Sequence, residues 1–179
     1  FDSGKKSNPT QNQAPETYIF LFTAQDSSLG IDATASKQIV HWWGDDPDGV
    51  VVGFYFMWEG IDSAWIFTPE NDSTFSLPIG SADTTYKILV STVDGSGNGD
   101  YDSEVIRNGI NYGPEPYIDE NGNGIFDDGE KFYDIGLIDP TPASLIFPIK
   151  NTPPVVEWNE LSFLPDSSPN LTLMYLTIT

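Results

Sequence analysis

The chain has 179 residues, 39% of them hydrophobic and 13% aromatic, enough to bury the core of one full domain and part of a second. It carries 27 acidic side chains against 7 basic ones, a formal net charge of −20. Such a surface repels nucleic-acid phosphates and anionic lipid, which argues against both as partners, and it attracts divalent cations. Cysteine is absent, so disulfides, thiolate nucleophiles and zinc–thiolate sites are excluded. No apolar run of about 18 residues is present, and we expect no transmembrane segment.

Residues 1–14 are rich in Lys, Ser, Asn, Gln and Pro and predict a flexible leader. The chain begins with Phe1 instead of Met, which suggests a processed product. Leaders of this composition follow the lipid-modified cysteine of bacterial lipoproteins. We therefore expect a secreted or cell-surface protein, with a lipid anchor through a cysteine upstream of Phe1 as a hypothesis.

From residue 16 onward, short apolar segments alternate with turns rich in Gly, Pro, Asp and Asn, the pattern of an all-β protein. No stretch has convincing helical periodicity. The predicted strands are 18–23, 37–43, 50–58, 64–68, 74–78, 85–93 and 143–149. The run at 50–58 is apolar on both faces, which predicts a central strand.

Two regions depart from this pattern. Residues 94–139 are rich in Gly, Asn and Asp and have little periodicity, and a structureless loop of this length needs something to organise it. Residues 151–154 (NTPP) predict a linker, and the remainder holds only two strand-like pieces, too few to bury a core. We expect one domain over 15–151 and, over 152–179, the start of an incomplete second one; packing of this piece on the first domain is the alternative.

Several residues lie in an order along the chain that indicates a family. They are Trp42 with the following turn Asp46-Pro47-Asp48-Gly49, the run Gly53-Phe54-Tyr55-Phe56, Trp65, Leu77-Pro78 with Tyr86, and Val93-Asp94. In this order they resemble strand B with the B–C turn, strand C, strand C′, the tyrosine corner between strands E and F, and the end of strand F of a fibronectin type III or related immunoglobulin-like sandwich of bacterial surface proteins. The resemblance implies a two-sheet sandwich whose F–G connection carries the long insertion 94–139.

Within the insertion, residues 119–130 (DENGNGIFDDGE) have the spacing of an EF-hand calcium loop. That resemblance assigns Ca²⁺ to side-chain oxygens of Asp119, Asn121, Asn123, Asp127 and Glu130 and to the backbone carbonyl of Ile125. Gly124 would supply the sharp turn. The flanks are not helical, so we expect an isolated dockerin-like loop whose metal replaces a missing core. The alternative is a solvated acidic loop without metal.

Two further groups are candidates for binding. Asp45, Asp46 and Asp48 lie on one turn, and Asp94 begins the insertion at the same pole of a sandwich, so together they are a candidate second cation site. Turn chemistry alone also explains an Asp-Pro-Asp-Gly sequence. Trp43 and Tyr55 are candidates for aromatics that face a ligand, because alternation places Trp42 and Trp43 on opposite faces of one strand.

Catalytic arrangements are weakly represented. His41 is the single histidine, and no nucleophile elbow or phosphate-binding glycine loop is present. We expect a protein that is not an enzyme: a non-catalytic, calcium-stabilised structural or adhesive module of an extracellular or cell-surface multidomain protein. The alternative is a carbohydrate- or ligand-binding sandwich that uses exposed aromatics. Its partners would be calcium and a surface glycan, a surface protein or neighbouring copies of itself.

Overall fold

The computed structural model describes residues 11–21 and 36–151. Within these ranges the chain forms strands and no helix, which confirms the all-β prediction. The strands are β1 Glu16–Leu21, β2 Lys37–Asp45, β3 Val51–Trp58, β4 Ile66–Thr68, β5 Asp72–Ser76, β6 Thr84–Asp94, β7 Ile106–Arg107, β8 Ile110–Asn111 and β9 Ala143–Ile149. In these same ranges, no helix has the length and apolarity needed to cross a membrane. The predictions for residues 1–10, 22–23 and 152–179 lie outside the described residues.

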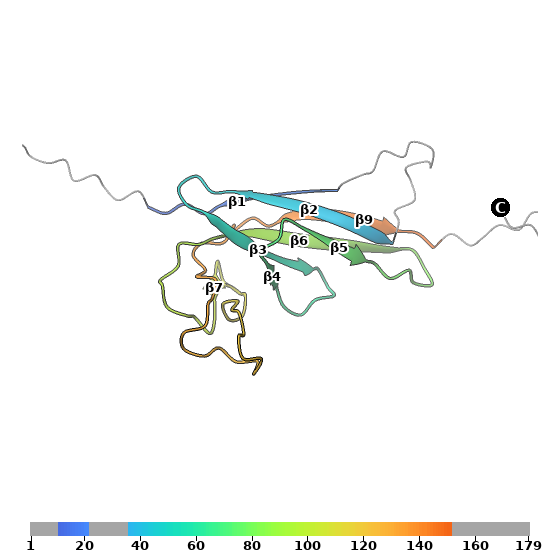
Figure 1. Cartoon of the computed structure of the whole chain (residues 1–179). Coiled ribbons are helices and arrows are strands. Elements are labelled where there is room, and N and C mark those ends of the chain that lie inside the picture. Colours follow the sequence, from blue (N-terminus) through green and yellow to red (C-terminus); the bar gives the residue numbers. More distant parts are fainter. Residues whose placement is uncertain (1–10, 22–35, 152–179) are drawn as a thin grey trace, which may run out of the picture.

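The strands form two main antiparallel sheets that lie face to face (Figure 1). One sheet has the order β1-β2-β5 and the other has the order β4-β3-β6-β9. The insertion contributes only the small pair β7-β8. Consecutive strands therefore do not always pair: the chain crosses from one sheet to the other between β2 and β3, between β4 and β5 and between β5 and β6.

Alternating residues of both sheets point inward and form the main core. Its buried members are Val40, Trp42, Phe54, Phe56, Trp58, Leu77, Ile88, Val90, Phe147 and Ile149. The ring of Trp42 is buried, and its indole nitrogen donates a hydrogen bond to the Glu70 carbonyl oxygen at 2.9 Å, so its one polar group is satisfied. This arrangement is that of a β-sandwich.

The outer face of β3 and β6 is also buried. Tyr55 and Val93 point away from the main core and pack against residues of the insertion, which include Val105, Tyr112 and Ile135. β3 lies between β4 and β6 and is covered on both sides, which confirms the prediction of a central strand. The insertion thus has a hydrophobic core of its own, and the expectation that a metal must replace a missing core is wrong for its proximal part.

Two tyrosines of the sheets differ in how their hydroxyl groups are satisfied. The Tyr86 hydroxyl donates a hydrogen bond to the Pro78 carbonyl oxygen at 2.8 Å and so closes the connection between β5 and β6. The Tyr55 hydroxyl is buried and has no hydrogen-bond partner among the described residues. Burial is the main cause that raises the Tyr55 pKa, and the negative charge of Glu115 adds to the shift.

We predict opposite effects of removing these two hydroxyls. Tyr86→Phe loses a hydrogen bond and lowers the free energy of unfolding by about 1 kcal/mol, whereas Tyr55→Phe removes an unsatisfied buried group and is neutral or stabilising. Urea denaturation of both variants beside the wild type measures the difference. A Tyr55→Phe variant that is destabilised more than Tyr86→Phe would contradict this assignment.

Candidate metal centre in the insertion

The insertion leaves the sandwich and returns to it at one narrow base. The Asp94 amide donates to the Leu137 carbonyl oxygen at 2.9 Å, and the Gly136 amide donates to the Asp94 carbonyl oxygen at 2.8 Å. A Cβ atom on Gly136 would come within 2.8 Å of the Ser96 backbone, so the two segments approach more closely than a side chain allows. The base is therefore a fixed junction between the insertion and β6.

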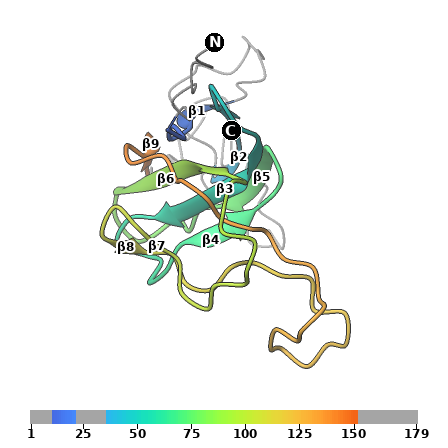
Figure 2. The ribbon, with the colours of Figure 1, turned by 90° about the vertical axis from the view of Figure 1, so that its left-hand side faces the viewer.

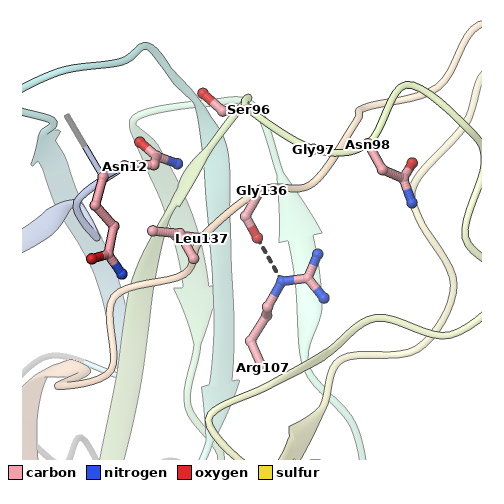
Figure 3. Close-up of a pocket in the computed structure, with 8 residues that line it drawn as sticks. Asn12, Ser96, Gly97, Asn98, Arg107, Gly136 and Leu137 are labelled. Carbon is pink, nitrogen blue, oxygen red and sulfur yellow. Dashed lines mark hydrogen bonds between the residues drawn. The ribbon is translucent and has the colours of Figure 1, made fainter. Parts of the chain in front are cut away.

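Arg107 reinforces this junction through backbone carbonyl groups. Its Nε donates to the Gly136 oxygen at 2.6 Å (Figure 3). Its Nη2 donates to the Ile135 oxygen at 2.7 Å. It makes no ion pair with any carboxylate of the described residues. A hollow of about 390 Å³ lies beside it, lined by Gln11, Asn12, Ser96, Gly97, Asn98, Arg107, Gly136 and Leu137. Because its donors hold main-chain oxygens, Arg107 serves to position the returning segment.

A buried carboxylate ties three segments of the insertion together. Glu115 is 1% exposed, and its two oxygens accept the Ile135 amide at 2.7 Å and the Asp102 amide at 2.9 Å. Its own amide donates to the Asp102 carbonyl oxygen at 2.9 Å. Burial raises the pKa of this carboxyl, while the two backbone hydrogen bonds act in the opposite direction.

Beyond this anchored part, residues 116–133 form an arm that projects from the sheets (Figure 2). Its two sides are joined by the Ile118 amide to the Lys131 oxygen at 2.8 Å and the Tyr133 amide to the Pro116 oxygen at 2.8 Å. Four aromatic rings pack at its base: Tyr101, Tyr117, Phe126 and Phe132. The predicted calcium loop therefore lies at the end of an arm whose two sides are joined by an isolated bridge between Tyr117 and Phe132, with no helix on either side.

The loop winds around the carboxyl group of Asp119. Oδ1 accepts the Gly122 amide at 2.6 Å and the Asn123 amide at 3.2 Å, and Oδ2 accepts the Gly124 amide at 2.8 Å. These hydrogen bonds lower the pKa of Asp119, and the bond from the Gly124 amide contributes most. Gly124 has φ of 78°, the left-handed turn expected at this position. The carboxylate thus turns the first half of the loop back on itself.

The other proposed ligand side chains make hydrogen bonds across the loop. The side-chain amides of Asn121 and Asn123 both donate to Oδ2 of Asp127, at 2.6 and 2.7 Å. Glu130 reaches back across the loop, and its two oxygens accept the Glu120 amide at 2.9 Å and the Asp127 amide at 3.0 Å. The second half of the loop is therefore closed onto the first.

The donor set fits a hard cation only if amide and carbonyl oxygens take part. Within the described residues, no group of three or more His, Cys, Asp or Glu side chains is placed to hold a metal ion. Three of the six proposed ligands are carboxylates, those of Asp119, Asp127 and Glu130, and the others are amide or main-chain oxygens. Calcium accepts all three kinds of oxygen. Binding would require the two asparagine amides to present oxygen in place of the nitrogen that now faces Asp127.

The second acidic cluster is only partly assembled. Asp46 and Asp94 both approach Gly49, where an added Cβ would lie 2.5 Å from an Asp46 oxygen and 3.2 Å from an Asp94 oxygen. Oδ1 of Asp46 accepts the Gly49 amide at 3.0 Å, and Asp48 is exposed. Asp45 is also exposed, and it lies opposite Glu16 on the outward face of the first sheet. Turn hydrogen bonds account for Oδ1 of Asp46, whereas its Oδ2 is buried without a partner among the described residues. A second cation site stays a prediction.

The two candidate aromatics lie in different environments. Trp43 is 47% exposed on the outer face of β2, and Tyr55 is 1% exposed in the second core. The choice that the sequence left open is decided for Tyr55 in favour of the core, so its ring is not available to a ligand. Trp43 remains as a surface aromatic.

No protein-family model, no curated protein and no solved structure matches the chain.

Sequence reasoning missed the residues that anchor the insertion. Glu115 and Arg107 were not singled out, although each carried a signal: Arg107 is the only arginine in the chain, and Glu115 stands between two prolines. Their partners are main-chain groups far along the sequence, and no spacing rule reveals such contacts.

We predict that Glu115→Gln lowers stability by about 1–3 kcal/mol, because one buried amide then faces the side-chain NH₂ group instead of an oxygen. The raised pKa adds a pH signature. Between the ordinary pKa of a glutamate in the unfolded chain and the raised pKa in the folded protein, the folded state holds more protons, so this group adds stability as the pH falls. The stability difference between wild type and variant should therefore widen from pH 7 toward pH 5 in urea denaturation. A difference that narrows would mean that the hydrogen bonds outweigh burial.

Proposed function

We propose that this protein is a non-catalytic, calcium-stabilised β-sandwich module of an extracellular or cell-surface multidomain protein, with a structural or adhesive role. The observation that carries the proposal is the folding of residues 119–130 onto themselves: Asn121 and Asn123 donate to Asp127, and the carboxylates of Asp119 and Glu130 accept main-chain amides of the same loop. A twelve-residue calcium loop requires such folding to bring its oxygens together.

The order of strands supports a fibronectin type III or related immunoglobulin-like module. The residues that resemble strands B, C and F lie on β2, β3 and β6, and Trp65, which resembles strand C′, directly precedes β4. β2 pairs with β1 and β5, while β4, β3 and β6 are adjacent in the opposite sheet. This is the division between two sheets that the family resemblance implies. The Tyr86 hydrogen bond to the Pro78 carbonyl oxygen is further support, since it is the contact expected of a tyrosine corner.

Calcium would neutralise the three loop carboxylates and cross-link both halves of the loop. Calcium would stabilise the arm at 116–133 in particular, because the proximal part of the insertion is already held by its own hydrophobic core and by Glu115 and Arg107. Loops of this kind in extracellular modules bind at roughly 10⁻⁴ to 10⁻³ M.

A non-catalytic role accords with the environment of the acidic groups. Glu115 and Asp94 are buried, and their carboxylate oxygens accept hydrogen bonds from main-chain or side-chain amides. The carboxylate of Asp119 does the same in the loop. Carboxylates used in this way organise loops.

We predict that calcium slows tryptic cleavage after Lys131, which directly follows the last loop ligand. At a calcium concentration about ten times the dissociation constant, the population of the opened arm falls about tenfold, and the cleavage rate falls with it. Mass spectrometry of timed digests in calcium and in chelator measures the rate. Cleavage after Arg107, whose side chain is held by main-chain oxygens, serves as an internal reference that calcium leaves unchanged.

Two variants of the loop separate ligation from charge. Glu130→Gln removes the closing carboxylate and should weaken calcium binding in calorimetry by about tenfold or more. Asp128→Asn removes the same charge at a neighbouring position without an assigned ligand role, and should leave the affinity within about twofold, since an exposed charge has a small effect. Equal rates of cleavage after Lys131 in calcium and in chelator would refute the proposal.

A further inference from the structure

The outer face of the sheet β1-β2-β5 carries aromatic and aliphatic side chains where a solvated sheet face is normally polar. Tyr18 and Phe20 on β1 and Ile39 and Trp43 on β2 are each between 41% and 47% exposed. His41 lies between the last two on the same face. Contiguous exposed apolar residues of this kind mark interaction sites more often than single ones do.

The aromatic rings of this face are ordered in two parallel stacks. Tyr18 is directly opposite Trp43, and their ring centroids are 4.2 Å apart with an angle of 14° between the planes. Phe20 is directly opposite His41, with ring centroids 5.4 Å apart and an angle of 15°. Because each pair stacks across the two strands, every ring has one face against its partner and the other face turned away from it.

The outward ring faces of Tyr18 and Phe20 are turned toward the edge of the sheet. β1 is the terminal strand of this sheet among the described residues, so no strand of the described part covers that side (Figure 1). The two residues are two positions apart on one strand, about 6.6–6.8 Å. The rings of Tyr18 and Phe20 therefore lie side by side along β1, and stacking on Trp43 and His41 fixes their orientation.

We propose that these two ring faces form a binding platform for a neutral carbohydrate chain, with successive sugar rings stacking on Tyr18 and Phe20. A pyranose ring has an apolar C–H face that suits an aromatic ring and hydroxyl groups at its rim. Carboxylates flank the rings and accept such hydroxyls: Glu16 and Asp45 are paired at one end of the face, and Asp72 lies opposite His41. Bracing by the second ring of each stack means that little side-chain freedom is lost on binding.

Charge favours a neutral glycan over the other occupants. The net charge of −20 and the flanking carboxylates repel acidic polysaccharides. The same charge opposes the approach of a second copy of this chain. This inference goes beyond the calcium-stabilised module proposed above and does not depend on the calcium loop.

The test is affinity electrophoresis in native gels that contain hydroxyethylcellulose, galactomannan or xyloglucan as neutral probes and alginate as an anionic probe. We expect at least one neutral polymer to retard the protein and alginate to have no effect. Tyr18→Ala and Phe20→Ala should each weaken binding by about tenfold or more, as is usual for aromatic anchors. Ile146→Ala, which changes a 60% exposed residue on β9 of the other sheet, is the matched control and should bind as the wild type does.

Three outcomes would overturn the inference. These are no retardation by any neutral polymer, retardation that Tyr18→Ala and Phe20→Ala leave unchanged, and a dimer in sedimentation that these variants dissociate, which would assign the face to a second copy. Thermal melts of the variants establish that they fold, and Phe20→Ser provides a second change at the same surface. Repeating the gels in chelator keeps this result separate from the calcium proposal.

Discussion

The antiparallel pairing of β3 with β6 is the contact on which both hydrophobic cores depend. Alternation along these strands sends Phe54, Phe56 and Trp58 into the sandwich and Tyr55 to the opposite side. Cross-strand pairing then places Tyr55 directly opposite Ser91, beside Val93 in the second core. A slip of one residue would exchange the two sets, so this register is specified from both faces at once. The insertion is attached to the end of β6 and folds over the same strand pair.

The acidic composition shapes how the insertion is held. With 27 acidic and 7 basic side chains, most carboxylates lack a cationic partner of their own. Glu115 and Asp119 instead accept several main-chain amides each, and such charge-assisted bonds are stronger than neutral ones. The single arginine does the converse, since it donates to main-chain oxygens. A calcium ion in the distal loop would extend the same principle, with a cation in place of amide donors.

The two proposed sites lie on different parts of the molecule. The loop is at the end of the arm that extends from the covered face of β3 and β6, and the aromatic face belongs to the opposite sheet (Figures 1 and 2). Between them stands the main core, which includes Trp42 and Phe56. A rigid sandwich that separates two surface features is suited to a module whose faces serve different contacts.

The sequence by itself determined the class of fold, the approximate positions of the strands in the two main sheets and the EF-hand-like spacing at 119–130, because each depends on neighbours within a few residues: alternation, turn chemistry and a twelve-residue motif. It also indicated that one of Trp42 and Trp43 faces outward. It did not indicate the short pair β7-β8 in the insertion. Only the tertiary structure decided that Tyr55 is buried, that Glu115 and Arg107 anchor the insertion, and that Tyr18 stacks on Trp43. Those facts depend on register and closeness between segments far apart in the chain, and no local pattern of residues encodes them.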